Sequence, residues 1–240
     1  MTQNYLTFLA IAAIATVNVC LLLYNMIIKY NIVGLLLKKF NPGAAAIFFF
    51  EKAAGLIIFG VIPNMLLVLF TRLTSQDSGL TFGRLGEHSV LVAFSIIAIL
   101  ILSYFVSGIK QGGNKVSVSN IRELTPGNVI PVVTGWMLYL LGYEFMFRGI
   151  LWFVCVMAFG LIPALAINLL LYALAHINQG TTKILGSIPA GILFCLFSYL
   201  TGSFILAFLV HTTMAVSYEL FLAYNATGIK VRPVFKNPRQ

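Results

Sequence analysis

Residues Val129–Phe159 read VIPVVTGWMLYLLGYEFMFRGILWFVCVMAF, an apolar run that carries Glu144 and Arg148 near its middle. About 20 apolar residues suffice to cross the hydrocarbon core of a bilayer, so a helix of this length must tilt or partly leave the core. An ionised side chain at mid-bilayer costs roughly 2.5–3.5 kcal/mol. Glu144 and Arg148 are four residues apart and face one side of a helix, where pairing offsets part of that cost.

The composition places the whole chain in a membrane. Of its 240 residues, 60% are hydrophobic and only 9% are charged, and the mean hydropathy is +0.99. Soluble domains carry about 25% charged residues. Because the apolar residues form long continuous runs, we predict an all-α polytopic membrane protein with a single membrane domain over residues 1–240.

The apolar runs predict about seven transmembrane helices in one bundle. No linker between them is long enough to separate domains. In chain order, the predicted spans are Tyr5–Ile28, Ala44–Phe70, Ser89–Ile109, Val129–Phe159, Leu161–Ile177, Ile184–Leu200 and Phe204–Tyr224.

A charged pair, Glu51 and Lys52, interrupts the second run. Long charged side chains near a membrane surface extend their charged ends toward water. We therefore predict that Glu51 and Lys52 lie near the membrane surface and extend their charged ends toward water. The alternative is that residues 38–50 lie along the interface and that the crossing begins near Ala53.

The basic residues predict the orientation, because cytoplasmic loops of helical membrane proteins carry an excess of Lys and Arg. With the N-terminus external and the C-terminus cytoplasmic, only Arg72 and Arg84 fall in external loops. We therefore expect a multi-pass protein of the cell (inner or plasma) membrane, and the positive charge requires no nucleic-acid partner. The basic residues on the predicted cytoplasmic side are Lys29, Lys38, Lys39, Lys110, Lys115, Arg122, Lys183, Lys230, Arg232, Lys236 and Arg239.

Two histidines lie in the later apolar runs. His211 lies inside the last predicted span, where a polar side chain without hydrogen-bond partners is costly, so we expect it to face other polar groups. His176 ends the fifth run before a polar turn, and a helix-end histidine at the membrane surface is the simpler alternative there. Together with Glu144 they are three proton-active side chains on three helices, and we predict that they converge.

Three kinds of chemistry suit one glutamate and two histidines in a membrane. In the first, Glu144 activates water as a general base with help from His176, and His211 stabilises the oxyanion. In the second, the three side chains hold a zinc ion that lowers the pKa of bound water to about 7, although the sequence has no HExxH motif. In the third, they form the proton relay of a transporter.

Three elements in these segments resemble the CPBP family of intramembrane proteases (CAAX prenyl protease type II and bacteriocin-processing, also called Abi). The family pattern has two adjacent glutamates, an arginine four residues on and then a glycine. A later segment has an aromatic residue four positions before a histidine, and a further helix has a histidine with Asn or Asp four residues on. Here the elements read YEFMFRG at 143–149, YALAH at 172–176 and HTTMA at 211–215, and the resemblance covers about residues 129–225.

The resemblance implies a membrane-embedded endopeptidase that cleaves a membrane-associated peptide or protein within the lipid bilayer. It implies catalytic roles for Glu144, His176 and His211, which are also the ligands if zinc is the cofactor. The implied supporting residues are Arg148, Tyr143 and Tyr172.

Two positions depart from the family pattern. Tyr143 stands where the first glutamate belongs, which in the family resembles the residue that activates water. Ala215 stands where an Asn or Asp would help to hold the oxyanion, and a methyl group donates no hydrogen bond. A catalytically weakened or inactive relative, acting as a scaffold or a bacteriocin-immunity protein, is therefore one alternative. A proton-coupled transporter is another, although no inverted repeat is visible.

Overall fold

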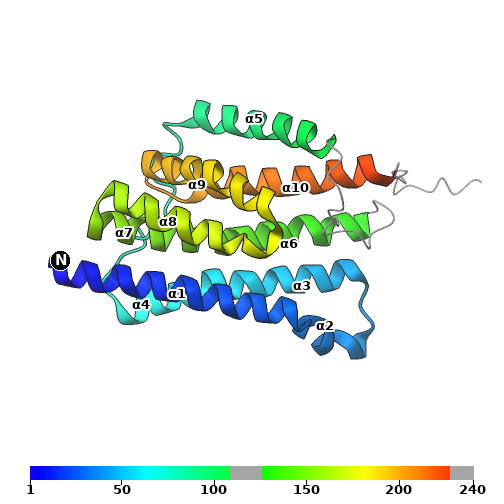
Figure 1. The fold of residues 1–240 in the computed structure, drawn as a ribbon, viewed down its shortest axis with the longest axis horizontal. Helices are drawn as coiled ribbons and strands as arrows, with labels where there is room; N and C mark the ends of the chain where they lie inside the picture. The colour runs from blue at the N-terminus through cyan, green and yellow to red at the C-terminus, as the bar shows by residue number, and fades with distance from the viewer. Residues whose placement is uncertain (109–125, 228–240) are drawn as a thin grey trace, which may run out of the picture.

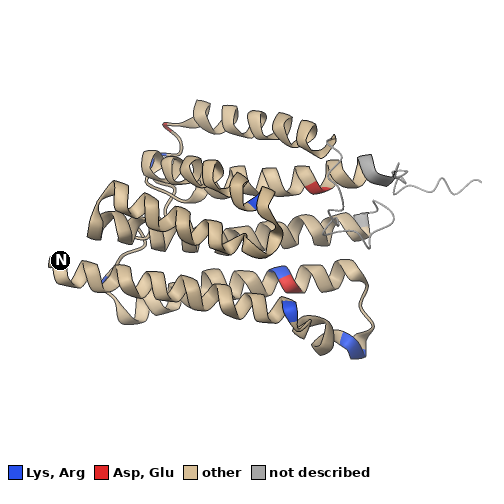
Figure 2. Cartoon of the chain, in the orientation of Figure 1, with Lys and Arg blue, Asp and Glu red and all other residues tan. Residues whose placement is uncertain are grey.

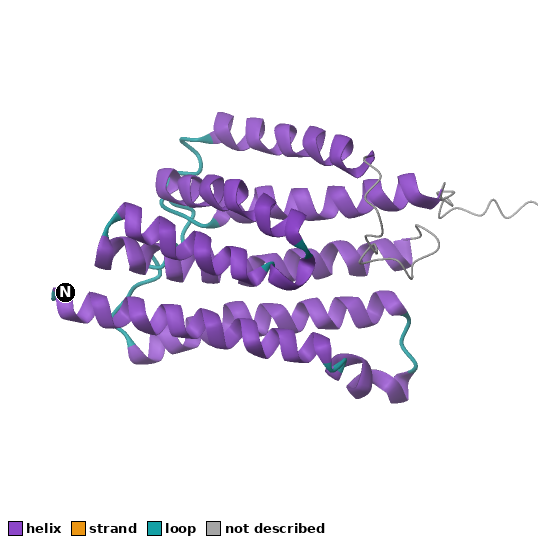
Figure 3. Ribbon diagram, viewed as in Figure 1, coloured by secondary structure: helices purple, strands orange, loops and turns teal. Residues whose placement is uncertain are grey.

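The computed structural model describes residues 1–108 and 126–227, and within these ranges every regular element is helical (Figure 3). This confirms the predicted all-α class. Ile109, the basic residues between 110 and 122 and those of the C-terminal tail lie outside the described residues. The elements are α1 (Gln3–Lys29), α2 (Ile32–Leu37), η1 (Lys38–Phe40), α3 (Ala44–Leu56), η2 (Ile57–Val61), α4 (Ile62–Phe70), α5 (Ser89–Gly108), α6 (Pro126–Glu144), η3 (Phe145–Leu151), α7 (Trp152–Phe159), α8 (Leu161–Ala175), η4 (Ile177–Gln179), α9 (Thr181–Thr201) and α10 (Ile205–Thr227).

Six segments of the described chain are long and apolar enough to cross a membrane, and they correspond to six of the seven predicted runs. The remaining run, the fifth in chain order, forms α8, which has 15 residues and is about 22 Å long at about 1.5 Å per residue. That is less than the roughly 30 Å of a bilayer core. The six segments are Gln3–Lys29, Ala44–Phe70, Ser89–Gly108, Gly127–Phe159, Thr181–Thr201 and Ile205–Tyr224.

The second predicted run is one continuous helical segment, made of α3, the π-helical η2 and α4. Helix begins at Ala44 and passes through Glu51 and Lys52 without a break. The alternative of an interfacial segment that precedes a crossing from Ala53 is therefore not supported by the helix boundaries.

Helix α6 lies in the middle of the bundle (Figure 1). It packs against α3 on one side and against α10 on the other, and α5 lies at the outside of the bundle against α10. α8 and α9 form a pair whose connecting turn stops short of the ends of α3 and α10 in Figure 1. His176 lies between the end of α8 and this turn.

Close approach of α6 to η2 depends on two glycines. A Cβ atom added at Gly142 would lie 3.0 Å from the backbone nitrogen of Gly60, and one added at Gly60 would lie 3.1 Å from the Cα of Gly142. Small residues allow membrane helices to approach at the backbone, where packing rather than the hydrophobic effect drives association. This contact holds the N-terminal helices against the helix that carries Glu144.

The charged residues are few, and basic residues gather at one end of the described bundle. Figure 2 shows Lys and Arg gathered around α2 and the end of α1, the region of Lys29, Lys38 and Lys39. Arg72 and Arg84 belong to the long connection between α4 and α5. The orientation of the two ends relative to the cytoplasm stays a prediction.

Candidate active site

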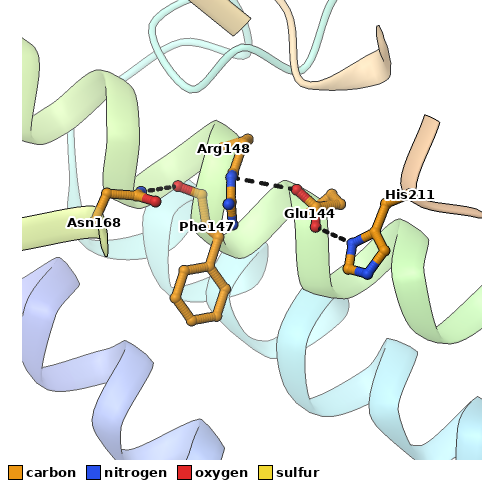
Figure 4. Close-up of polar contacts among 5 residues, drawn as sticks. All are labelled: Glu144, Phe147, Arg148, Asn168 and His211. Carbon is orange, nitrogen blue, oxygen red and sulfur yellow. Dashed lines mark hydrogen bonds and ion pairs between the residues drawn. The ribbon is translucent and has the colours of Figure 1, made fainter. Parts of the chain in front are cut away.

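Glu144 is the last residue of α6 and contacts charged or polar side chains on both sides (Figure 4). Its Oε1 lies 2.6 Å from Nδ1 of His211 on α10, and its Oε2 lies 3.5 Å from Nε of Arg148. The side chains of Glu144 and Arg148 are fully buried, while His211 is 8% exposed. The structure thus brings Glu144 and His211 into direct contact and pairs Arg148 with the same carboxylate.

The contact with Glu144 determines which nitrogen of His211 is available for chemistry. An ionised carboxylate only accepts hydrogen bonds, so Nδ1–H of His211 donates to Oε1. Nε2 keeps its lone pair and lies on the far side of the ring from Glu144 in Figure 4. A carboxylate that fixes the tautomer of an imidazole in this way prepares the other nitrogen to accept a proton.

His176 is half-buried and follows the last residue of α8. Its Nδ1 lies 2.8 Å from the carbonyl oxygen of Tyr172, which can only accept, so Nδ1–H is the donor here as well. The Tyr172 ring lies beside both histidines, with its centroid 4.7 Å from the His176 ring and 6.4 Å from the His211 ring. One aromatic ring therefore separates the third predicted catalytic residue from the Glu144–His211 pair.

The guanidinium of Arg148 is held between aromatic rings. Its Cζ lies 4.0 Å from the ring centroid of Tyr172 and 5.4 Å from that of Phe194 on α9. Arginine stacks on aromatic faces more readily than lysine because its charge is planar and weakly hydrated. A Cβ added at Gly191 would lie 3.5 Å from Nη2, so this glycine leaves room for the stacked group.

The charged pair is placed by an irregular turn of helix. Directly after Glu144 the chain becomes π-helical over Phe145–Leu151, and the whole of this segment is buried. π-Helical turns are rare and occur frequently at functional sites. The Trp152 N–H donates to the carbonyl oxygen of Phe147, the i→i+5 bond that defines the wider turn.

Asn168 on α8 supports this irregular turn. It is fully buried, and its side-chain amide donates to the carbonyl oxygen of Phe147 at 2.7 Å (Figure 4). In a regular α-helix, the N–H of Leu151 would occupy this carbonyl. Sequence reasoning missed Asn168. The signal was available, because Asn168, Tyr172 and His176 are spaced by four residues and share one helical face.

Tyr143 and Ala215, the two residues that depart from the family pattern, both pack against apolar or aromatic side chains. The buried Tyr143 ring lies 4.7 Å from the Phe147 ring, 5.6 Å from the Phe59 ring and 6.2 Å from the His211 ring, measured between centroids. Its hydroxyl is buried and has no hydrogen-bond partner within residues 1–108 and 126–227. Ala215, one turn after His211, packs against the apolar core.

The arrangement does not suit a zinc ion held by Glu144, His176 and His211. The described residues contain no group of three His, Cys, Asp or Glu side chains placed to hold a metal. His211 turns Nδ1 toward one oxygen of Glu144, and Arg148 faces the other. A dication would compete with that guanidinium for the same carboxylate.

Fold and site together define a multi-pass helical membrane protein with a Glu–His pair inside the bundle. Residues 125–217 match the family model described as type II CAAX prenyl endopeptidase Rce1-like, which confirms the predicted resemblance to the CPBP family. The matched residues make up less than half of the chain and include Glu144, Arg148, His176 and His211. No curated protein and no solved structure matches the chain.

Proposed function

We propose that the protein is an intramembrane endopeptidase in which the Glu144–His211 pair activates water to cleave a membrane-associated peptide. The observation that carries the proposal is the 2.6 Å contact between the buried carboxylate and the imidazole. Inside a bilayer such a pair is expensive, and intramembrane ionisable residues generally mark a functional site. The family match adds the class of reaction.

The geometry favours His211 over Glu144 as the general base. Glu144 is fully buried and both of its oxygens face charged or polar partners, whereas His211 keeps a free lone pair on Nε2. Nε2 removes a proton from water as the water oxygen attacks the scissile carbonyl carbon. The imidazolium then gives this proton to the leaving amine when the C–N bond breaks, and Glu144 stabilises the charged ring.

The developing oxyanion needs a hydrogen-bond donor, and Ala215 supplies none. We assign this role to His176. Its Nδ1–H already donates to the Tyr172 carbonyl, so in the protonated state Nε2–H is a second donor directed elsewhere. The sequence suggested that His176 helps to activate water and that His211 stabilises the oxyanion. We propose the two roles the other way round.

The substrate class follows from the family alone. A CAAX-type substrate is a membrane-attached chain that ends in a lipidated cysteine followed by three residues. Cleavage after that cysteine releases a tripeptide.

Cleavage by the full-length protein in lipid vesicles tests the proposal. The substrate is a farnesylated peptide that ends in Cys and three further residues, and mass spectrometry detects the released tripeptide. We expect Glu144→Gln and His211→Gln to lower turnover by about 10²–10⁴-fold, as loss of an orienting carboxylate or a base does elsewhere. The control is His88→Gln, since His88 lies on an exposed connection and binds the backbone of Arg84. Full activity of both site variants would overturn the proposal.

A non-catalytic scaffold or immunity protein is the second candidate. Tyr143 and Ala215 favour it, because apolar packing replaces a carboxylate and an amide of the family pattern. Under this alternative, the wild type would release no tripeptide from any membrane peptide, and Glu144→Gln would not alter its association with partner proteins.

A further inference from the structure

A lysine that the proposed chemistry does not use lies next to the helix that carries Glu144. Lys52 on α3 is half-buried, and its Nζ lies 4.1 Å from the ring centroid of Trp136 and 4.3 Å from that of Tyr139, both on α6. Phe48 on its own helix adds a third ring at 5.3 Å. We call these three rings the aromatic cage of Lys52.

The cage gives Lys52 a different environment from the one the sequence suggested. The ammonium does not extend away from the bundle but lies over two rings of the neighbouring helix. A Cβ added at Gly135 would lie 3.4 Å from the Lys52 Cβ, so the missing side chain at this position lets α3 lie close to α6. A lysine within a membrane span is costly and indicates function by default.

Two helices give the same separation between this ammonium and the Glu144–His211 pair. Along α6, Tyr139 and Trp136 precede Glu144 by five and eight residues, or about 8–12 Å at about 1.5 Å per residue. Along α10, Glu219 interacts electrostatically with Lys52 and follows His211 by eight residues, or about 12 Å at the same rise. The ammonium is therefore about 10 Å from the site along the bundle.

We propose that Lys52 binds the C-terminal carboxylate of the substrate and so measures three residues from the scissile bond. Three residues in extended conformation span about 10 Å, which matches the separation on both helices. The inference rests on the proposed peptidase function. An ammonium offers three donors, and the cage rings accept no ordinary hydrogen bonds, so Lys52 is able to donate to a substrate carboxylate in addition to its electrostatic interactions with Glu51 and Glu219. Glu51 and Glu219 balance the charge of the ammonium when no substrate is bound.

Cleavage of matched peptides tests the anchor. Two farnesylated peptides of identical sequence end in a free carboxylate or in a carboxamide. We expect wild-type kcat/KM to be at least about tenfold higher for the acid than for the amide, mainly through KM, as for a charge-assisted contact. Lys52→Met should abolish this preference, so that the ratio of kcat/KM for acid and amide falls to about one. One additional residue before the terminus should lower kcat/KM of the wild type for the acid but not that of Lys52→Met. Lys29→Met is the control, since Lys29 is exposed and also lies over a tyrosine ring.

Binding without cleavage separates this inference from the proposed function. The chain has two tryptophans, and Trp136 belongs to the cage. In a Glu144→Gln, Trp152→Phe background, Trp136 fluorescence should report binding of the acid at about tenfold lower Kd than binding of the amide. If the wild type cleaves nothing while this preference depends on Lys52, the result supports carboxylate binding by Lys52 and rejects the peptidase function. Equal Kd for acid and amide, or a preference that survives Lys52→Met, overturns the anchor whether or not cleavage occurs.

Discussion

At the level of single residues, the carboxylate of Glu144 is shared between a guanidinium and an imidazole. The sequence predicted the first partner from the four-residue spacing and the second from the improbability of an isolated histidine inside a span. It could not predict which partner faces which oxygen, because that depends on how α10 packs against α6. Nor could it show that the Tyr143 ring is buried against His211, since tyrosine is enriched at membrane–water interfaces.

The Glu144–Arg148 pair predicts an asymmetry between single and double variants. Arg148→Met alone leaves a buried carboxylate without its cation, a change that typically costs about 3–5 kcal/mol. The double variant Glu144→Gln, Arg148→Met removes both charges and should regain most of the lost stability. Thermal unfolding of the purified variants in detergent measures the difference. Equal unfolding temperatures for the single and the double variant would show that the two charges are not coupled.

Ala215 predicts a gain of activity at the same scale. Ala215→Asn places an amide donor one helical turn after His211, where the family pattern has Asn or Asp. Loss of one oxyanion donor typically costs 10²–10³-fold in rate, so the added donor should raise turnover by at least about tenfold. Tyr143→Glu should not help alone, because it removes a ring packed against Phe59 and Phe147. Unchanged tripeptide release by Ala215→Asn would contradict a weakened oxyanion site.

At the level of elements, the apolar runs predicted the helices to within a few residues, since run length alone reports a membrane span. The length of an apolar run could not predict the π-helical turn after Glu144, because a hydrogen bond between residues i and i+5 leaves no pattern in hydrophobicity. Its partner Asn168 carried a signal, as a polar residue within an apolar run. The short α8 was predicted as a full span because its residues are as apolar as those of longer helices.

Asn168 predicts how the π-helical turn serves the site. Asn168→Leu removes the donor to the Phe147 carbonyl, which should favour regular α-helical bonding and rotate Arg148 relative to Glu144. We expect at least about tenfold lower turnover and a shifted pH–rate profile. Simple destabilisation would lower the active fraction without moving the profile. The control is Asn18→Leu, because the Asn18 amide binds a carbonyl of its own helix. An unaltered pH profile in Asn168→Leu would reject a positioning role.

At the scale of the whole molecule, the two ends of the bundle differ in charge, and this difference predicts the orientation in the membrane. The end near α2 carries Lys29, Lys38 and Lys39, whereas the connection after α4 carries Arg72 and Arg84. The excess of basic residues marks the cytoplasmic side. A protease for lipidated C-terminal peptides needs its anchor near the side from which those peptides arrive, and Lys52 lies on the helix that begins closest to α2.

Cysteine labelling in intact cells tests this orientation. The native cysteines Cys20, Cys155 and Cys195 are buried and need no replacement. A membrane-impermeant maleimide should label Ser75→Cys from outside the cell, because this residue follows the span Ala44–Phe70 on the predicted external side. It should label Lys39→Cys only after the membrane is opened. If both cysteines react in intact cells, the segment between them does not cross the membrane. If the pattern is reversed, the anchor and the site face the wrong compartment for a cytoplasmic substrate, and the substrate class must be sought among external peptides.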